Sequence, residues 1–160
     1  MRIGQGFDVH AFAPNRKLVL GGIEISYHQG LLGHSDADVL LHAVMDAMLG
    51  ALALGDIGHH FPDTDVRYRG ADSVVLAKTV WGMVRDCGYR LGNLDVMVLA
   101  QAPKIAPYIT AMRQRVANCF DANLSQVSIK ATTMEKMGFV GREEGMAAMA
   151  VVLLIPNEGV

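Results

Sequence analysis

Two residues near the N-terminus and one about thirty positions later have the types and spacing of a metal site. Asp8 and His10 are two residues apart at the end of a predicted strand, so both side chains point to the same side. His42 lies in a segment with helical periodicity. A carboxylate and two imidazoles supply three N/O ligands and leave one position open, which is the pattern of a catalytic zinc site.

The same residues also have simpler interpretations. A D-x-H pair often makes only a strand-end hydrogen bond, and a helical histidine often lies hydrogen-bonded in a core. The surroundings favour a metal, because all six histidines lie between residues 10 and 60, close to a cluster of aspartates (Asp36, Asp38, Asp56, Asp63 and Asp65). Asp46, one turn after His42, is predicted to hold the other ring nitrogen of that histidine.

A second region, IKATTMEKMGFVGREEG from Ile129 to Gly145, has groups suited to phosphate. Thr132 and Thr133 end a predicted strand, where hydroxyl and backbone N–H groups can donate to phosphate oxygens. Glu135 follows and can hold a hard cation against them, and Arg142 supplies a planar fork for phosphate. The alternative is a strand-to-loop transition with a solvated Lys/Glu pair.

The segment Gln101 to Lys104 also ends a predicted strand and leads into a helix. Its exposed backbone could bind the edge of a base, and Lys104 could balance phosphate charge. A surface lysine is the simpler explanation of that residue taken alone.

Hydrophobic periodicity predicts the elements that position these groups. The first helix has apolar residues at 40, 41, 44, 45, 48, 49 and 52, is capped by Ser35 or Asp36 and ends near Gly55. Asp56 to Asp65 is expected to be a polar loop. The other helices are predicted over Asp72–Cys87 and Pro107–Phe120, and the strands over Arg2–Val9, Leu18–Leu20, Ile23–Tyr27, Leu94–Gln101, Val127–Thr133 and Met146–Ile155. This order predicts an α/β (α+β) two-layer sandwich, with a mixed sheet and helices on one face.

Composition limits the classes of function. A chain of 160 residues suggests one domain, residues 1–160, and its 51% hydrophobic and 19% charged residues favour an oligomer that buries part of its surface. A net charge of −2 with scattered basic residues argues against nucleic-acid binding. No signal peptide or membrane span is visible, and Cys87 and Cys119 form no CxxC pair, which favours a cytoplasmic protein.

Seven motifs in a fixed order resemble one family along essentially the whole chain. They are GFDVHAF, LGG, GLLGHSDADVLLHA, GDIGHHFPDTD, GADS, LAQAPK and IKATTMEKMGFVGREEG. The chain thereby resembles the 2-C-methyl-D-erythritol 2,4-cyclodiphosphate synthase family of the non-mevalonate isoprenoid pathway. The resemblance implies a homotrimer with sheets facing a threefold axis and an active site at each subunit interface.

The implied reaction is an intramolecular phosphoryl transfer. The 2-phosphate of 4-diphosphocytidyl-2-C-methyl-D-erythritol 2-phosphate attacks its own β-phosphorus, which closes a cyclic diphosphate and releases CMP. The resemblance implies that Asp8, His10 and His42 bind Zn²⁺ (or Mn²⁺), and that Glu135 binds Mg²⁺ (or Mn²⁺) together with the diphosphate. His34 and Thr133 match positions that stabilise the transition state.

The resemblance also implies the substrate contacts. The methylerythritol phosphate pocket matches His34, Ser35, Asp56, Ile57, Gly58, Phe61 and Asp63. The cytidine pocket, expected on the neighbouring subunit, matches Ala100, Gln101, Ala102, Pro103, Lys104, Ile105, Ala106, Ala131, Thr132 and Thr133. Further substrate contacts match Asp8, Val9, His10, Pro62, Thr64, Asp65, Met134, Glu135, Phe139 and Arg142.

Three departures and two alternative functions accompany this hypothesis. His59-His60, Ile105-Ala106 and Met149 differ from residues of other family members, and Met149 puts in doubt an isoprenoid diphosphate regulator in the central cavity. A non-catalytic nucleotide- or metal-binding module would need the three predicted metal ligands but not His34, Asp56, Thr133 and Glu135 together. A metal phosphohydrolase would use the open metal position to activate water.

Overall fold

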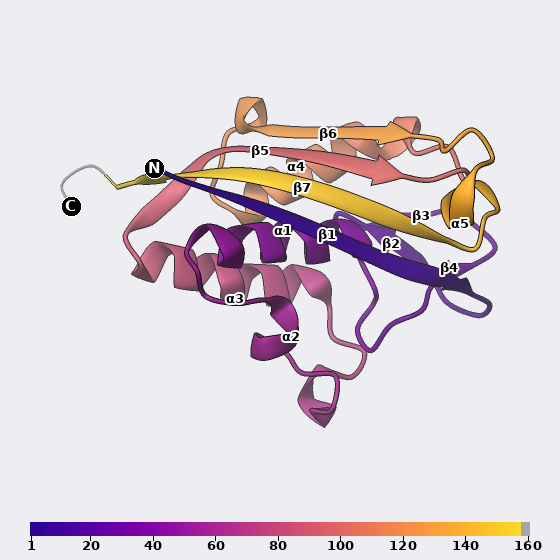
Figure 1. The fold of residues 1–160 in the computed structure, drawn as a ribbon, viewed down its shortest axis with the longest axis horizontal. Helices are drawn as coiled ribbons and strands as arrows, with labels where there is room; N and C mark the ends of the chain where they lie inside the picture. The colour runs from indigo at the N-terminus through magenta and orange to yellow at the C-terminus, as the bar shows by residue number, and fades with distance from the viewer. Residues whose placement is uncertain (158–160) are drawn as a thin grey trace.

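The computed structural model describes residues 1–157, which form a five-stranded sheet with helices on one face (Figure 1). The strand order is β4-β1-β7-β5-β6, and a separate hairpin pairs β2 with β3. The strands are β1 (Arg2–Ala13), β2 (Leu18–Leu20), β3 (Ile23–Ile25), β4 (Gly30–Leu31), β5 (Tyr89–Leu99), β6 (Val127–Thr132) and β7 (Gly145–Pro156). Because β5 and β6 are parallel and the other pairs in the sheet are antiparallel, the mixed sheet predicted from the sequence is confirmed.

Three long helices make up most of the second layer. They are α1 (Val39–Ala51), α3 (Ser73–Asp86) and α4 (Ile109–Cys119), and shorter turns are α2 (Ile57–His60), α5 (Gly138–Gly141), η1 (Val66–Tyr68), η2 (Ala106–Tyr108) and η3 (Leu124–Gln126). The predicted helix from Asp72 to Cys87 is confirmed, with those two residues as its caps. The predicted loop from Asp56 to Asp65 is wrong in one respect, because its first half forms α2.

The helix α1 is almost completely buried between the sheet and α3, and it carries His42. Its N-cap was predicted at Ser35 or Asp36, but the structure places it at Asp38, whose carboxylate accepts a bond from Leu41 N at 3.1 Å. The two earlier side chains make other bonds instead. The strand β1 passes directly over α1, which brings the metal-type residues of strand and helix together (Figure 1).

Asp38 also ties the β2–β3 hairpin to the start of α1. Its two carboxylate oxygens accept bonds from Gly21 N (2.9 Å) and Gly22 N (2.7 Å). Both glycines have positive φ, 57° and 71°, which favours a tight two-residue hairpin turn. Complete burial raises the pKa of Asp38 to about 6, although the three backbone N–H bonds act in the opposite direction.

Replacing Asp38 with alanine is expected to lower the free energy of unfolding by about 3 kcal/mol. The change removes a helix cap and leaves buried hairpin N–H groups without an acceptor. Urea denaturation followed by circular dichroism measures the loss. An unfolding midpoint equal to that of the wild type would show that the hairpin does not depend on this carboxylate.

Candidate metal centre and phosphate site

The side chains of β1 alternate between the helix layer and the exposed face of the sheet. Asp8 and His10 lie on the same side as Gly4 and Gly6 and point toward α1. A Cβ atom added at Gly6 would lie 1.9 Å from Ala43 O, so the strand backbone touches the helix at this point. This close approach lets the short side chain of Asp8 reach His42, whose ring is almost fully buried on α1.

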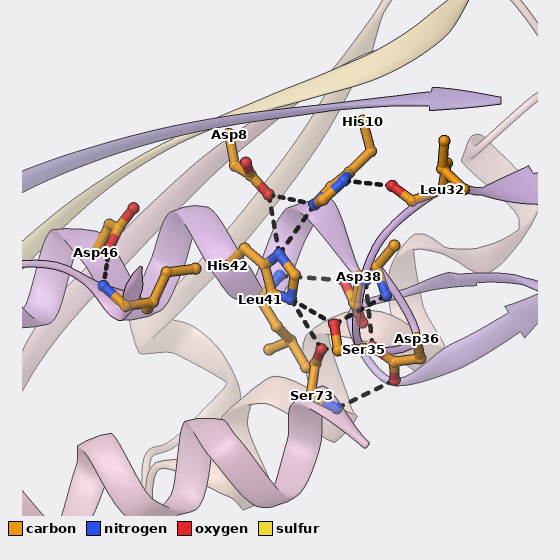
Figure 2. A network of polar contacts seen from close by, with 12 residues as sticks. Asp8, His10, Leu32, Ser35, Asp36, Asp38, Leu41, His42, Asp46 and Ser73 are labelled. Carbon is orange, nitrogen blue, oxygen red and sulfur yellow. Dashed lines mark hydrogen bonds and ion pairs between the residues drawn. The ribbon is translucent and has the colours of Figure 1, made fainter. Parts of the chain in front are cut away.

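Asp8, His10 and His42 bring three ligand atoms together (Figure 2). Asp8 Oδ2 lies 3.0 Å from His10 Nε2 and 3.0 Å from His42 Nδ1, and the two nitrogens are 3.1 Å apart. Ligand atoms of a tetrahedral zinc ion are about 3.3–3.5 Å apart, so a small outward movement would fit this triangle to the ion. The predicted residues therefore form a group that could hold a metal ion.

Hydrogen bonding and charge prepare this group to bind a cation. Burial raises the pKa of Asp8, but the hydrogen bonds and charges of His10 and His42 outweigh it, so the net pKa lies below its usual value. Burial lowers the pKa of His10, and its pairing with Asp8 reverses this to a net rise. His10 Nδ1 lies 2.7 Å from Leu32 O and must donate to it, so in the neutral imidazole the lone pair is on Nε2, which faces Asp8 and His42.

The prediction that Asp46 holds the other ring nitrogen of His42 is wrong. Asp46 accepts a bond from Ile57 N at 2.8 Å and so anchors the start of α2. His42 Nε2 instead contacts Ser73 Oγ at 3.0 Å and Ser35 Oγ at 3.2 Å (Figure 2). The motif GADS contained Ser73, but its sequence distance from His42 gave no reason to pair the two residues.

A pocket of about 500 Å³ opens over the metal-type group. Nine of the residues predicted for the metal and substrate line it together with His42: Asp8, His10, His34, Ser35, Ile57, Gly58, Phe61, Pro62 and Asp63. The sequence interpretation missed five residues that complete its wall, Leu32, Gly33, Met45, Tyr68 and Leu76. These are mostly apolar, and their types alone indicate a core rather than a pocket.

Four of the contacts predicted between Asp8 and Asp65 lie outside this lining. Val9 points to the opposite face of β1 and is exposed. Asp56 caps α2 by accepting from His59 N at 2.9 Å, Thr64 is exposed, and Asp65 pairs with Arg67 at 2.6 Å. The ring of His60 contacts Leu54 O rather than the metal-type group.

The residues predicted for cytidine form a separate, smaller pocket of about 170 Å³ at the ends of β5 and β6. All residues of the predicted cytidine set except Ala102 line it: Ala100, Gln101, Pro103, Lys104, Ile105, Ala106, Ala131, Thr132 and Thr133. Next to it, Thr133 Oγ1 donates to Glu135 Oε1 at 2.7 Å. Arg142 follows α5 and pairs with Glu144 at 2.7 Å.

The sheet register separates the two pockets within one chain. Val9 pairs with Ala147, Ala147 with Leu99, and Leu99 with Thr132, so these residues form one row across β1, β7, β5 and β6. Three strand spacings amount to about 14 Å between the ends of this row. Both pockets therefore lie at the same end of the strands, one beside β1 and the other at the ends of β5 and β6. The chain does not bring Thr133 and Glu135 to its own metal-type group.

Comparisons with known proteins agree with this geometry. The YgbB family model matches residues 1–155. A protein of Geobacillus sp. (strain WCH70) named 2-C-methyl-D-erythritol 2,4-cyclodiphosphate synthase is 61% identical over 153 residues, which is 96% of this chain and 97% of that protein.

Two solved structures share the fold over almost the whole chain. IspF of Plasmodium falciparum in complex with CDP has a TM-score of 0.87 and 33% sequence identity to this chain. The match covers 98% of this chain and 97% of that protein. The bifunctional IspDF of Campylobacter jejuni has a TM-score of 0.92 and 46% identity over 96% of this chain, but the match covers only 42% of that longer protein. The family model, the curated relative and the fold thus agree over nearly every residue, and the chain belongs to the YgbB family.

Proposed function

We propose that the chain is a metal-dependent synthase that converts 4-diphosphocytidyl-2-C-methyl-D-erythritol 2-phosphate to 2-C-methyl-D-erythritol 2,4-cyclodiphosphate, an isoprenoid precursor, and releases CMP. The observation that carries this proposal is the triangle of Asp8, His10 and His42 in a pocket that also contains His34 and Ser35. The identity of about 60% to proteins of that name over 96% of the chain supports it. Residues 1–160 would act as one synthase domain, in the class of phosphorus–oxygen lyases.

The reaction transfers a phosphoryl group within one molecule. An oxygen of the 2-phosphate forms a bond to the β-phosphorus, and the bond from that phosphorus to the bridging oxygen of the CMP phosphate breaks. CMP leaves with the electron pair. Such a transfer needs positioning and neutralisation of charge rather than a covalent intermediate on the protein.

The residues of the two pockets suit these tasks. Asp8, His10 and His42 would hold Zn²⁺ or Mn²⁺, and the hard carboxylate of Glu135 would hold Mg²⁺ or Mn²⁺. Bound divalent cations supply Lewis-acid polarisation of phosphate oxygens. His34 and Thr133 would donate hydrogen bonds to the oxygens that gain charge in the transition state.

The remaining substrate groups have matching partners. Asp56 and Asp63, beside the metal-type pocket, would accept bonds from the methylerythritol hydroxyls. The pocket that contains Ala100 and Lys104 would hold cytidine. A cytidine ligand is supported by the CDP present in the related Plasmodium falciparum structure.

A homotrimer would join the two pockets into one site. The face of the sheet opposite the helices exposes Ile3, Phe7, Val9, Met149 and Val151, each at least 40% accessible. An apolar face of this kind favours burial against other subunits. With the sheets packed around a threefold axis, the Glu135 pocket of one subunit would face the Asp8 pocket of its neighbour.

We place the protein in the cytoplasm, which is supported by two free cysteines, Cys87 and Cys119. Among residues 1–157, none of the helices combines the length and the hydropathy required to span a bilayer. The partners would be the small-molecule substrate and further copies of the chain, without nucleic acid or membrane.

Phosphorus NMR of the protein with the cytidyl substrate, Zn²⁺ and Mg²⁺ tests the proposal. We expect signals of a cyclic diphosphate and of CMP in equal amounts. Linear phosphate products would instead identify a metal phosphohydrolase, and an unchanged spectrum would identify a binding module without this activity.

A further inference from the structure

The ring of His42 has different partners on its two nitrogens. Nδ1 faces Asp8 and His10, while Nε2 faces the hydroxyl oxygens of Ser73 at 3.0 Å and Ser35 at 3.2 Å. A neutral imidazole has one N–H group and one lone pair, so it can present the lone pair to only one of these sides. The direction of the hydroxyl bonds therefore decides whether His42 can bind a cation.

Asp36 fixes the direction of the Ser73 hydroxyl. Ser73 Oγ donates to Asp36 Oδ1, and Ser73 N donates to Asp36 Oδ2 at 3.1 Å (Figure 2). Because a hydroxyl has a single proton, Ser73 Oγ can only accept from His42. His42 must then carry a proton on Nε2, so in the neutral imidazole the lone pair is on Nδ1 and points at Asp8 and His10.

Ser35 cannot replace Ser73 in this respect. Its Oγ accepts from Ala37 N at 3.1 Å, which leaves its own proton free to be donated. If that proton went to His42 Nε2, the histidine would carry its own proton on Nδ1, directed into the metal-type group. That tautomer excludes a cation, so the two serines in contact with the same nitrogen have opposite effects.

We propose that Asp36 and Ser73 are positioning residues that hold His42 in the tautomer able to bind metal. This proposal rests on the metal site proposed above and extends it to two residues outside the ligand set. Ser73 is fully buried. The pair joins the loop before α1 to the first residue of α3. Leu32 O has the corresponding role for His10, because it accepts from Nδ1 and so fixes the tautomer of that ring.

Zinc affinity tests this proposal through a chelator competition at constant pH with protein stripped of metal. We expect Ser73→Ala to weaken zinc binding by about 10- to 100-fold. Ser73→Thr, which keeps the hydroxyl, should remain within about threefold of the wild type, as should Ser35→Ala, which removes the other hydroxyl. Equal affinity of the wild type and Ser73→Ala would overturn the proposal.

Nitrogen-15 NMR of the imidazoles in metal-free wild-type protein gives a second, independent test. The expected neutral form of His42 carries its proton on Nε2, and a neutral form with its proton on Nδ1 would overturn the proposal even if Ser73→Ala failed to fold. The two tests also separate this proposal from the metal site. Failure of the wild type to bind zinc would contradict the metal site alone, because the tautomer is observed without metal.

Discussion

Replacing His42 with alanine is expected to abolish tightly bound zinc and to lower kcat/KM by at least about 10³-fold, or roughly 4 kcal/mol of transition-state stabilisation. The ring is the member of the metal-type group that α1 contributes, and both of its nitrogens have partners among Asp8, His10 and two serines. Alanine leaves two ligands of three. Elemental analysis of the purified protein and steady-state kinetics measure the two effects, and full zinc occupancy in the variant would contradict the ligand assignment.

Glu135→Gln provides a matched comparison in the other pocket. The Glu135 carboxylate accepts a hydrogen bond from Thr133 Oγ1. Glu135 follows β6, and β7 and β5 lie between β6 and the strand β1 that carries Asp8 and His10. We expect this variant to keep its zinc and to lose magnesium-dependent turnover. Loss of zinc in Glu135→Gln would show that the two ions do not have separate ligands.

Co-expression of these two variants tests whether neighbouring subunits complete one site. In random hybrid trimers, about a quarter of the sites would combine an intact His42 with an intact Glu135 from the adjacent subunit. Turnover should therefore return to about a quarter of the wild-type value. Hybrids as inactive as the two parent variants would contradict an active site shared between subunits.

Replacing Gly6 with alanine is expected to lower the free energy of unfolding by about 3 kcal/mol or more. The new Cβ would lie 1.9 Å from Ala43 O and 2.8 Å from Ala47 N, both backbone atoms that no change of rotamer can move. The strand must then shift away from α1. Because Asp8 is two residues further along the same face, zinc affinity should fall together with stability.

Gly82→Ala is the control for this prediction. Gly82 lies inside α3, and a Cβ added there meets nothing within 4 Å. This variant should be as stable as the wild type or more stable by up to about 1 kcal/mol, because alanine favours a helix. Urea denaturation of both variants decides the matter, and a Gly6→Ala midpoint at or above that of Gly82→Ala would contradict the close-contact explanation.

The sequence by itself predicted most elements and the core of the metal-type group. A D-x-H pair in a strand must point to one side, because side chains alternate with a period of two. The helical spacing of apolar residues likewise predicted the helix that carries His42. These are local properties, and a short window of sequence contains the information for them.

The tertiary structure decided which side chains meet. Asp46 has the right helical spacing to support His42, yet the chain folds α2 against it, and Ser73, 31 residues from His42, takes that place. Gly4 and Gly6 matter because β1 crosses α1 at backbone contact, which no local pattern specifies. The register of four strands likewise places β6, which leads to Thr133 and Glu135, roughly 14 Å from β1, which carries Asp8 and His10. Such relations depend on how distant segments pack, so only the folded chain could show that the metal-type pocket and the pocket at the ends of β5 and β6 lie apart within one chain.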